Sequence, residues 1–236
     1  MARRRVLITG SSGRIGRHLC RHLAEFYELR GFDRVRGELP EEQVSGDVSD
    51  LSALAVACDG MDVVVHLAGN ASHQASWNEA LESNIQGTYN VFEAARRAGV
   101  KKIVYASTCQ VTFGYGSNSP QSPEMYPKSL SYYAASKVLG EQLGHVFAYN
   151  HGIDVICIRV GLFSESGRVP AHRAAGRFLG LADTVQIFQR AIDVMGVQFA
   201  VVYGVSRSSR RTLDLEQARR VLGYVPTESE DDLLTE

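Results

Sequence analysis

The chain has 236 residues, a length typical of one large α/β domain or of such a domain with a small appendage. Its hydrophobic content of 44% and charged content of 22% are ordinary for a globular protein, and its net charge of -1 gives no reason to expect a nucleic acid or an anionic membrane as partner. No apolar run approaches the roughly 18 residues that span a bilayer, and the short basic start is not expected to open a signal peptide.

The first predicted elements enclose a glycine-rich loop. An apolar run predicts a buried strand at residues 5–9, and helical spacing of apolar residues predicts a helix over residues 17–29. The intervening glycines permit a tight turn, a close approach of backbone N–H groups to a pyrophosphate, and close helix–strand packing. A helix N-terminus also favours an anion through its dipole and its unpaired N–H groups. We therefore expect a dinucleotide pyrophosphate to be held by Gly10, Ser12, Gly13, Arg14, Ile15 and Gly16.

The second predicted strand ends at residues 30–33 with an acidic side chain, Asp33. A carboxylate in this place accepts hydrogen bonds from the ribose hydroxyls of adenosine and repels a 2′-phosphate, which favours NAD over NADP. Arg34 and Arg36 act in the opposite direction if their guanidinium groups hold that phosphate, and have no such effect if they are simply solvated. NAD is the predicted cofactor.

Helices and strands continue to alternate up to residue 159. In chain order the predicted elements are a helix over 51–57, a strand over 61–67, a helix over 77–98, a strand over 102–106, a loop over 114–129, a helix over 131–149 and a strand over 153–159. This alternation predicts an α/β fold with a parallel, doubly wound sheet that helices cover on both faces.

The predicted helix over residues 131–149 carries Tyr133 four residues before Lys137, which places a phenol and an ammonium on one helix face. A free tyrosine has a pKa of about 10 and is a poor base at neutral pH. A nearby cation stabilises the phenolate and lowers that pKa, so that the pair can take a proton from an alcohol. The spacing alone is a weak signal, but here it follows a phosphate-binding loop on the same chain.

The pattern loosens after Gly161. The predicted elements there are a helix over 182–195, a strand over 198–203 and a short helix over 215–222, and the acidic residues 228–232 are expected to be solvated or frayed. We expect residues 1–236 to form a single dinucleotide-binding domain, with residues 162–236 contributing most of a small substrate-binding part.

Five separate motifs show that the sequence resembles the extended short-chain dehydrogenase/reductase (NAD-dependent epimerase/dehydratase) family, which has a Rossmann-type fold. They are the glycine loop and residues 46–48, 66–69, 84–90 and 105–108. The resemblance implies that Asp47 and Val48 contact the adenine ring, and that Asn84 supports the Lys137 side of the site. It also implies that Leu67, Ala68 and Gly69 line the nicotinamide ribose.

The same resemblance implies a catalytic set. Thr108 stands in place of the family's serine, Tyr133 is the base and Lys137 is its activator. Tyr133 takes the proton of a substrate hydroxyl, Thr108 orients the substrate oxygen, and hydride passes to the nicotinamide. The family's helices over 77–98 and 131–149 often pair, so a homodimer is possible by analogy.

Within the family, the sequence looks most like the uronate dehydrogenases, which oxidise glucuronate or galacturonate with NAD. The similarity lies in residues 158–161, 199–206 and 214–224. Thr108 is not followed by the acidic pair that dehydratases carry, and the part after Gly161 is short for a lobe that grips a sugar nucleotide. We expect NAD-dependent oxidation of a hydroxyl in a small sugar or sugar acid. The alternatives are a sugar-nucleotide epimerase and a non-catalytic NAD(P)-binding regulator.

The candidate substrate-binding residues are Ser72, Thr108, Cys109, Arg168 and Arg173. Uronate dehydrogenases resemble one another in carrying Ser-Asn-His where this chain has Thr108, Cys109 and Gln110, so the substrate stays open. A guanidinium binds a carboxylate bidentately, but spacing does not choose between the two arginines. Ser72 fits a turn equally well, and Cys109 a small buried hydrophobe.

No metal site is expected, because the seven histidines are scattered and the four cysteines are widely spaced. With no disulfide framework and no secretion signal, free thiols in a reducing cytoplasm are the expected state. The expected partner is therefore a small molecule, without nucleic acid or membrane.

Overall fold

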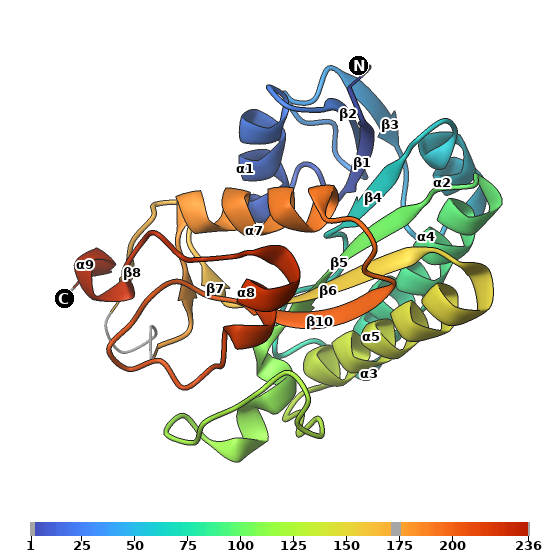
Figure 1. Cartoon of the computed structure of the whole chain (residues 1–236). Helices are drawn as coiled ribbons and strands as arrows, with labels where there is room; N and C mark the ends of the chain where they lie inside the picture. The colour runs from blue at the N-terminus through green and yellow to red at the C-terminus, as the bar shows by residue number, and fades with distance from the viewer. Residues whose placement is uncertain (1–2, 171–175, 236) are drawn as a thin grey trace.

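A parallel sheet of seven strands forms the centre of the computed structural model, which describes residues 3–170 and 176–235 (Figure 1). The sheet has the order β10-β6-β5-β4-β1-β2-β3. Its strands are β1 (Arg5–Thr9), β2 (Glu28–Asp33), β3 (Glu42–Ser45), β4 (Val63–His66), β5 (Lys102–Thr108), β6 (Asp154–Val160) and β10 (Phe199–Gly204). The strand order reverses between β1 and β4, and open α/β sheets bind ligands at the carboxyl edge of such a point.

Helices cover both faces of this sheet, so the predicted doubly wound Rossmann-type fold is confirmed. One face packs against α1 (Arg14–Leu23), α7 (Leu181–Asp193) and α8 (Glu216–Leu222), and the other against α2 (Leu51–Cys58), α4 (Gly87–Arg97) and α5 (Tyr132–His151). Successive side chains of a strand point to opposite faces, so Val6 and Ile8 enter the first core and Leu7 the second.

Two predicted helices differ from the observed ones. The helix predicted over residues 17–29 ends at Leu23, because Leu29 is buried as part of β2 rather than on a helix face. The helix predicted over 77–98 is divided into α3 (Trp77–Glu79), a π-helical segment η1 (Ala80–Gln86) and α4. The other predicted helices, and the strands for which both ends are predicted, begin and end within two residues of the observed elements.

The expectation that residues 228–232 are solvated or frayed is wrong for Glu230, although Asp231 and Asp232 are exposed. Glu230 is fully buried, and its carboxylate accepts hydrogen bonds from the backbone N–H groups of Gly176 and Phe178. Composition suggested an exposed acidic end, but backbone donors far away in the sequence satisfy this charge. The segment forms α9 (Glu230–Leu233) and β11 (Leu234–Thr235).

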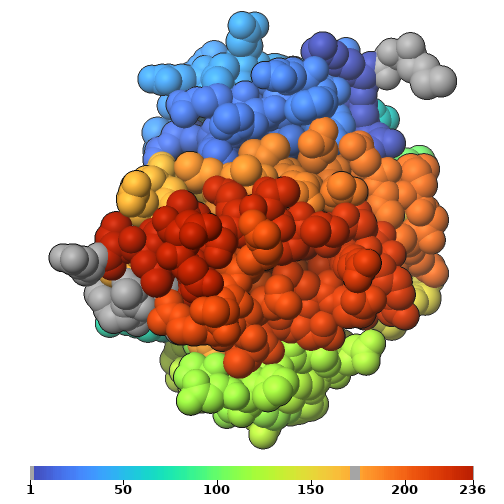
Figure 2. Space-filling view, turned by 60° about the vertical axis from the view of Figure 1, so that its left-hand side comes forward, coloured from blue at the N-terminus to red at the C-terminus, as the bar shows by residue number. Residues whose placement is uncertain are grey.

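Two small sheets extend the carboxyl edge of the large one. β11 pairs with β8 (Val169–Pro170), and β7 (Leu162–Phe163) pairs with β9 (Phe178–Leu179). Figure 2 shows the C-terminal part, in orange and red, spread over one face between the N-terminal residues in blue and the green segment that includes the 3₁₀ helix η2 (Cys109–Tyr115). This part stands next to the edge where β5 and β6 end.

Candidate active site and dinucleotide cleft

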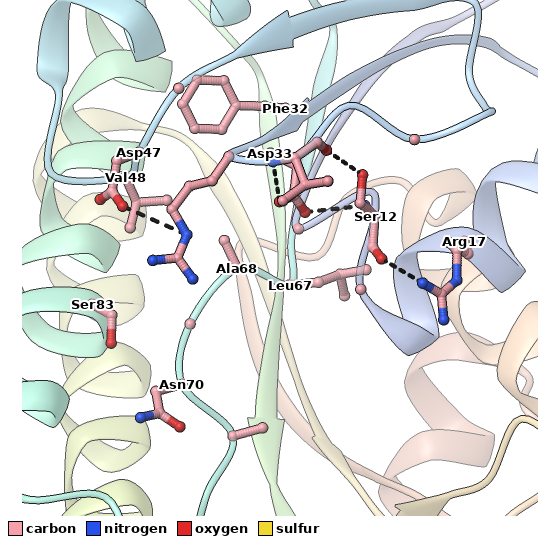
Figure 3. Close-up of a pocket in the computed structure, with 18 of the residues that line it drawn as sticks. Ser12, Arg17, Phe32, Asp33, Asp47, Val48, Leu67, Ala68, Asn70 and Ser83 are labelled. Atoms are coloured by element: carbon pink, nitrogen blue, oxygen red, sulfur yellow. Dashed lines mark hydrogen bonds and ion pairs between the residues drawn. The ribbon is translucent and has the colours of Figure 1, made fainter.

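A cleft with a volume of about 1610 Å³ opens where the strand order reverses. It is larger than the roughly 300–1,000 Å³ of a typical small-molecule pocket, as an extended ligand requires. Figure 3 shows Asp47 and Val48 on one side and Ser12 and Arg17 on the other, with Leu67 and Ala68 between them. Ser12 follows the end of β1, Asp47 and Val48 follow β3, Leu67 and Ala68 follow β4, and Arg17 lies on α1.

The glycine loop is shaped by backbone contacts that exclude larger residues. Gly10 has a φ of 73° and its N–H donates to the carbonyl of Phe32 at 2.8 Å. A Cβ on Gly16 would lie 2.1 Å from the carbonyl oxygen of Gly10, a distance that no side chain tolerates. Gly13 is the N-cap residue of α1 and has no side chain to accept a hydrogen bond. The first N–H groups of the helix therefore lack a side-chain acceptor and face the cleft. The loop has the form that a pyrophosphate requires.

The other predicted loop residues surround this helix end. The Ser12 hydroxyl donates to the carbonyl of Val35 at 2.6 Å, and Ser12 lines the cleft. Arg14 is exposed in the first turn of α1, where its charge acts on Tyr133, and Ile15 packs against the first core.

Asp33 ties the loop to the end of β2. Its carboxylate accepts hydrogen bonds from the N–H of Ser12 at 3.0 Å and of Val35 at 3.2 Å. Arg34 is 78% exposed and approaches the Asp47 carboxylate at 3.7 Å, a surface pair of little energetic value. Arg36 is also exposed and lines the cleft.

Asp47 and Val48 follow β3 on the opposite side of the cleft. A hydrogen bond from the N–H of Ser49 lowers the pKa of the Asp47 carboxyl and holds it in a turn. Val48 is buried, and its carbonyl accepts a hydrogen bond from the Asn90 side chain at 2.9 Å. A rigid apolar wall next to an ionised carboxylate suits an adenine base.

Leu67, Ala68 and Gly69 line the cleft after β4, and Asn84 binds the backbone of the residue that follows them. The Asn84 amide accepts from the N–H of Asn70 at 2.7 Å and donates to its carbonyl at 3.0 Å. The same amide donates to the hydroxyl of Ser136, the neighbour of Lys137, at 3.1 Å. Asn84 thus joins this segment to α5 through its side chain.

Tyr133 and Lys137 lie on one face of α5, whose first turn is capped by Ser131. Both side chains are buried. The Lys137 ammonium lies 6.0 Å from the centroid of the Tyr133 ring and 4.9 Å from that of Tyr105. A Cβ on Gly69 would lie 3.9 Å from the same ammonium, so the cleft and the Tyr–Lys pair adjoin.

Burial shifts the pKa values of this pair in opposite directions. Desolvation lowers the pKa of Lys137 to about 8 and raises that of Tyr133 to about 12. The Thr108 hydroxyl and the charge of Arg14 act against the second shift without cancelling it. The expected lowering of the Tyr133 pKa by Lys137 is therefore not observed in this structure, because burial dominates.

Thr108 ends β5 and caps η2, where its buried hydroxyl accepts from the N–H of Gln110 at 3.3 Å. Cys109 is also buried, and it packs in the first core beside Tyr133. Burial raises the pKa of its thiol to about 11, against the effect of the Arg177 charge. Cys109 is thus a neutral neighbour of the Tyr–Lys pair.

Other predicted substrate residues lie at the surface. Ser72 is exposed in a turn, where its hydroxyl accepts from the N–H of Gln74 at 3.2 Å. Arg168 is exposed in the turn before β8, and Arg173 lies outside the described residues. Neither Ser72 nor Arg168 is among the residues that line the cleft.

Arg177 is not among the residues that the sequence pattern singles out. Its guanidinium carbon lies 4.0 Å from the centroid of the Phe113 ring, and its Nε and Nη2 atoms are buried without a hydrogen-bond partner among the residues that the structure describes. Arg177 directly precedes the two apolar residues of β9. This short strand was not predicted, because the hydrophobic pattern is irregular after Gly161.

Within residues 3–170 and 176–235, no three His, Cys, Asp or Glu side chains gather in a way that could hold a metal ion. The same residues contain no helix with the length and apolar character to cross a membrane. All four cysteines are free and buried.

Comparison with known proteins gives one family and several related enzymes. The model of the NAD dependent epimerase/dehydratase family matches residues 6–181. The NAD-dependent glucose-6-phosphate dehydrogenase of Haloferax volcanii is 30% identical over 95% of this chain and 93% of its own, and the L-arabinose 1-dehydrogenase (NAD(P)(+)) of the same organism is 32% identical over 95% and 97%. The crystal structure of uronate dehydrogenase from Agrobacterium tumefaciens is similar with a TM-score of 0.90, at 27% identity over 98% of this chain and 87% of that one.

Proposed function

Because the chain belongs to the NAD-dependent epimerase/dehydratase family of extended short-chain dehydrogenases, we propose that it oxidises a hydroxyl of a small sugar or sugar acid and passes the hydride to NAD. One observation carries this proposal: the dinucleotide cleft adjoins Tyr133 and Lys137, since a Cβ on Gly69 would lie 3.9 Å from the Lys137 ammonium. The related enzymes are named for three different sugars but all for dehydrogenation.

In this proposal the cleft residues hold NAD in an extended form. The uncovered N–H groups at the start of α1 hold the pyrophosphate, and Asp33 accepts from the adenosine ribose. Asp47 and Val48 face the adenine, and Leu67, Ala68 and Gly69 face the nicotinamide ribose.

The catalytic residues then act on the substrate hydroxyl. Tyr133 takes its proton, Thr108 orients its oxygen, and Lys137 stabilises the charge that develops on the phenol. NAD, when bound, supplies the hydride acceptor. Because Tyr133 and Lys137 are buried, water is largely excluded from the proton transfer.

The function is tested by following NADH absorbance with NAD and single sugars: glucuronate, galacturonate, glucose 6-phosphate, L-arabinose and glucose. We expect NADH with at least one monosaccharide and none with UDP-sugars. Epimerised UDP-sugar without net NADH would instead establish the epimerase alternative. NAD binding without any product would establish a non-catalytic binder.

Asp33→Ala is expected to lower the preference for NAD over NADP by about tenfold or more, since hydrogen bonds to a charged group contribute about 1.5–3 kcal/mol. The ratio of kcat/KM for the two cofactors is the measurement. The ratio matters because loss of the Ser12 contact weakens both cofactors together. Glu38→Ala removes an exposed carboxylate from the same cleft and is the matched control, with an unchanged ratio. An unchanged ratio in Asp33→Ala would show that this residue does not read the ribose.

We also propose a homodimer formed through η1, α4 and α5. Large apolar side chains are exposed on these helices and just before them, among them Trp77, Tyr89, Tyr132, Val146 and Tyr149. Light scattering is expected to give twice the mass of one chain. Tyr149→Glu should reduce this mass, whereas Met195→Glu, at an exposed apolar residue outside these helices, should not. A monomeric wild-type protein would contradict the proposal.

The organisation of the chain is proposed as one dinucleotide-binding domain over residues 1–236, with residues 162–236 providing most of the substrate-binding part. The two small sheets beside the carboxyl edge support this division of roles. Free, buried thiols are consistent with the reducing cytoplasm as its location.

A further inference from the structure

A buried ion pair holds α5 against the sheet on the helix face that carries Tyr133 and Lys137. Glu141 lies one turn after Lys137 and about 12 Å along the helix axis from Tyr133. Arg159 of β6 donates to both oxygens of the Glu141 carboxylate, through Nε and Nη2, at 2.8 Å each. Both side chains are only 3% exposed. The proposed proton transfer uses neither of these charged groups.

Ser107 joins this ion pair to the strand end that carries Thr108. The Ser107 hydroxyl donates to Oε1 of Glu141 at 2.6 Å, and Ser107 stands opposite Arg159 in the register of β5 and β6. Ser107 directly precedes Thr108, whose hydroxyl acts on Tyr133. Ser107, Glu141 and Arg159 thus form a buried network that fixes α5 relative to β5 and β6.

The same network reaches the residue on the other side of Thr108. Arg159 donates to the Tyr203 hydroxyl at a longer distance of 3.5 Å, and this hydroxyl is hydrogen-bonded to that of Thr112 in η2 at 2.8 Å. The Thr112 hydroxyl contacts the carbonyl of Cys109 at 3.3 Å. The neighbours of Thr108 in the chain, before and after it, are therefore both tied to Arg159.

Close packing brings α5 to the sheet, but the buried network fixes its position along the helix axis. A Cβ on Gly140 would lie 2.2 Å from the Tyr105 hydroxyl, and one on Gly144 would lie 2.9 Å from Cγ1 of Val155. Glycines have no side chain to interlock with the strands, whereas the hydrogen bonds of Glu141 are directional. Replacement of a buried ion pair by apolar residues often leaves stability unchanged or raises it. The contribution of the pair is therefore expected in geometry rather than in stability.

On the basis of the proposed sugar oxidation, we infer that the buried network positions the catalytic residues, by holding Tyr133 and Lys137 on α5 in register with Thr108 on β5. A misplacement of about 1 Å can lower the rate of a reaction by about 100-fold. The network therefore acts on kcat. NAD affinity is unaffected, because the dinucleotide cleft is lined mainly by residues at and beyond the ends of β1, β2, β3 and β4.

Ser107→Ala tests this inference, since it breaks the link to β5 and leaves the ion pair intact. With the preferred sugar, kcat should fall about tenfold or more, while KM for the sugar and the Kd for NAD stay within about threefold of the wild type. The measurement is made well below the unfolding temperature. A serine with a purely structural role would lower the unfolding temperature and leave kcat unchanged, which would overturn the inference.

Ser206→Ala is the matched control. The Ser206 hydroxyl also donates to a buried carboxylate at 2.6 Å, that of Asp183, but this contact lies on α7, on the other face of the sheet. The control should lower the unfolding temperature as Ser107→Ala does and keep the wild-type kcat. An equal fall of kcat in both variants would show a general effect of lost stability and overturn the inference.

The ion pair is tested by the joint replacement Glu141→Leu with Arg159→Met, because either substitution alone leaves an unpaired buried charge. The joint variant should unfold near the wild-type temperature and lose about 10- to 100-fold in kcat. Ser107→Ala added to it should lower kcat by less than about twofold more, since the acceptor of its hydroxyl is gone. A wild-type kcat in the joint variant, or fully additive losses, would overturn the inference. If the joint variant does not fold, Ser107→Ala and its control decide.

The outcomes also separate this inference from the proposed function. Sugar oxidation with an unchanged kcat in Ser107→Ala would overturn the inference and leave the function standing. If no sugar is oxidised, hydrogen exchange measured by mass spectrometry decides the inference. Amides of residues 108–112 and 131–137 should exchange about tenfold faster in Ser107→Ala than in the wild type, with α1 unchanged. Equal exchange in the two proteins would overturn it.

Discussion

Tyr133→Phe is expected to lower kcat by about 10³- to 10⁴-fold while NAD affinity stays within about twofold of the wild type. The substitution removes only the hydroxyl that takes the substrate proton, and the buried ring keeps its packing on α5. Turnover is measured by NADH absorbance with the preferred sugar, and NAD affinity by calorimetry. Tyr132→Phe, at the exposed neighbouring tyrosine, is the matched control and should turn over like the wild type.

The pH dependence follows from the same groups. Burial raises the pKa of Tyr133 to about 12, so at neutral pH nearly all Tyr133 is protonated and only a small fraction is the phenolate base. The phenolate fraction, and with it kcat, should rise by about tenfold per pH unit below that pKa. The lowered pKa of Lys137, about 8, opposes this rise because the ammonium loses its charge above it. We therefore expect the rise to weaken above about pH 8.

A contrary result would be informative. If Tyr133→Phe turned over like the wild type, the base would lie elsewhere, and Tyr133 would be a buried packing residue. If NAD binding disappeared together with turnover, the hydroxyl would hold the cofactor rather than the substrate. A comparison of the pH profiles of the wild type and Tyr133→Phe separates these cases, because only a catalytic phenol gives a rise of kcat with pH that the substitution abolishes.

Local spacing explains why much of the site could be predicted from the sequence. The glycine loop, Asp33 and the Tyr133–Lys137 pair depend on short separations within one strand–helix unit or one helix turn. Their positions relative to each other follow from the parallel sheet, since strand ends meet at one edge. The alternation of strands and helices was sufficient to predict that sheet.

Other parts depend on contacts between distant segments and left no local signal. The burial of Glu230 is compensated by hydrogen bonds from residues 176 and 178, so composition gave the wrong expectation for this residue. The burial of the Arg177 Nε and Nη2 atoms, which have no partner among the described residues, likewise depends on the placement of Phe113 and β9. The π-helical segment η1 has no signature that differs from an ordinary helix, yet it carries Asn84.

The setting of Lys137 shows the same limit. Its ammonium lies over the ring of Tyr105, which the sequence presents only as a strand residue. A Cβ on Gly140 would lie 2.2 Å from the Tyr105 hydroxyl, so a glycine one turn after Lys137 makes room for that ring. This cation–π attraction is strongest when water is excluded. It stabilises the charged ammonium of Lys137, whereas burial favours the neutral amine.

Gly16→Ala is expected to weaken NAD binding by about 10- to 100-fold. The added Cβ would lie 2.1 Å from the carbonyl oxygen of Gly10 and 2.8 Å from the Cα of Ser11, so the backbone of the loop must move. Overpacking of this kind costs about 1–3 kcal/mol, and the shift also disturbs the hydrogen bond between Ser12 and Asp33. Calorimetric titration with NAD measures the loss.

A loss of NAD affinity must be distinguished from a general loss of stability, and another glycine provides the control. Gly152 ends α5 with a φ of 68°, and a Cβ there would meet no atom within 4 Å. Gly152→Ala should cost about 1 kcal/mol of folding free energy through backbone strain and leave NAD affinity unchanged. If Gly16→Ala bound NAD as tightly as Gly152→Ala, the loop between β1 and α1 would not be the pyrophosphate site. Weaker NAD binding in Gly16→Ala alone would place the pyrophosphate against the start of α1, where the uncovered N–H groups lie.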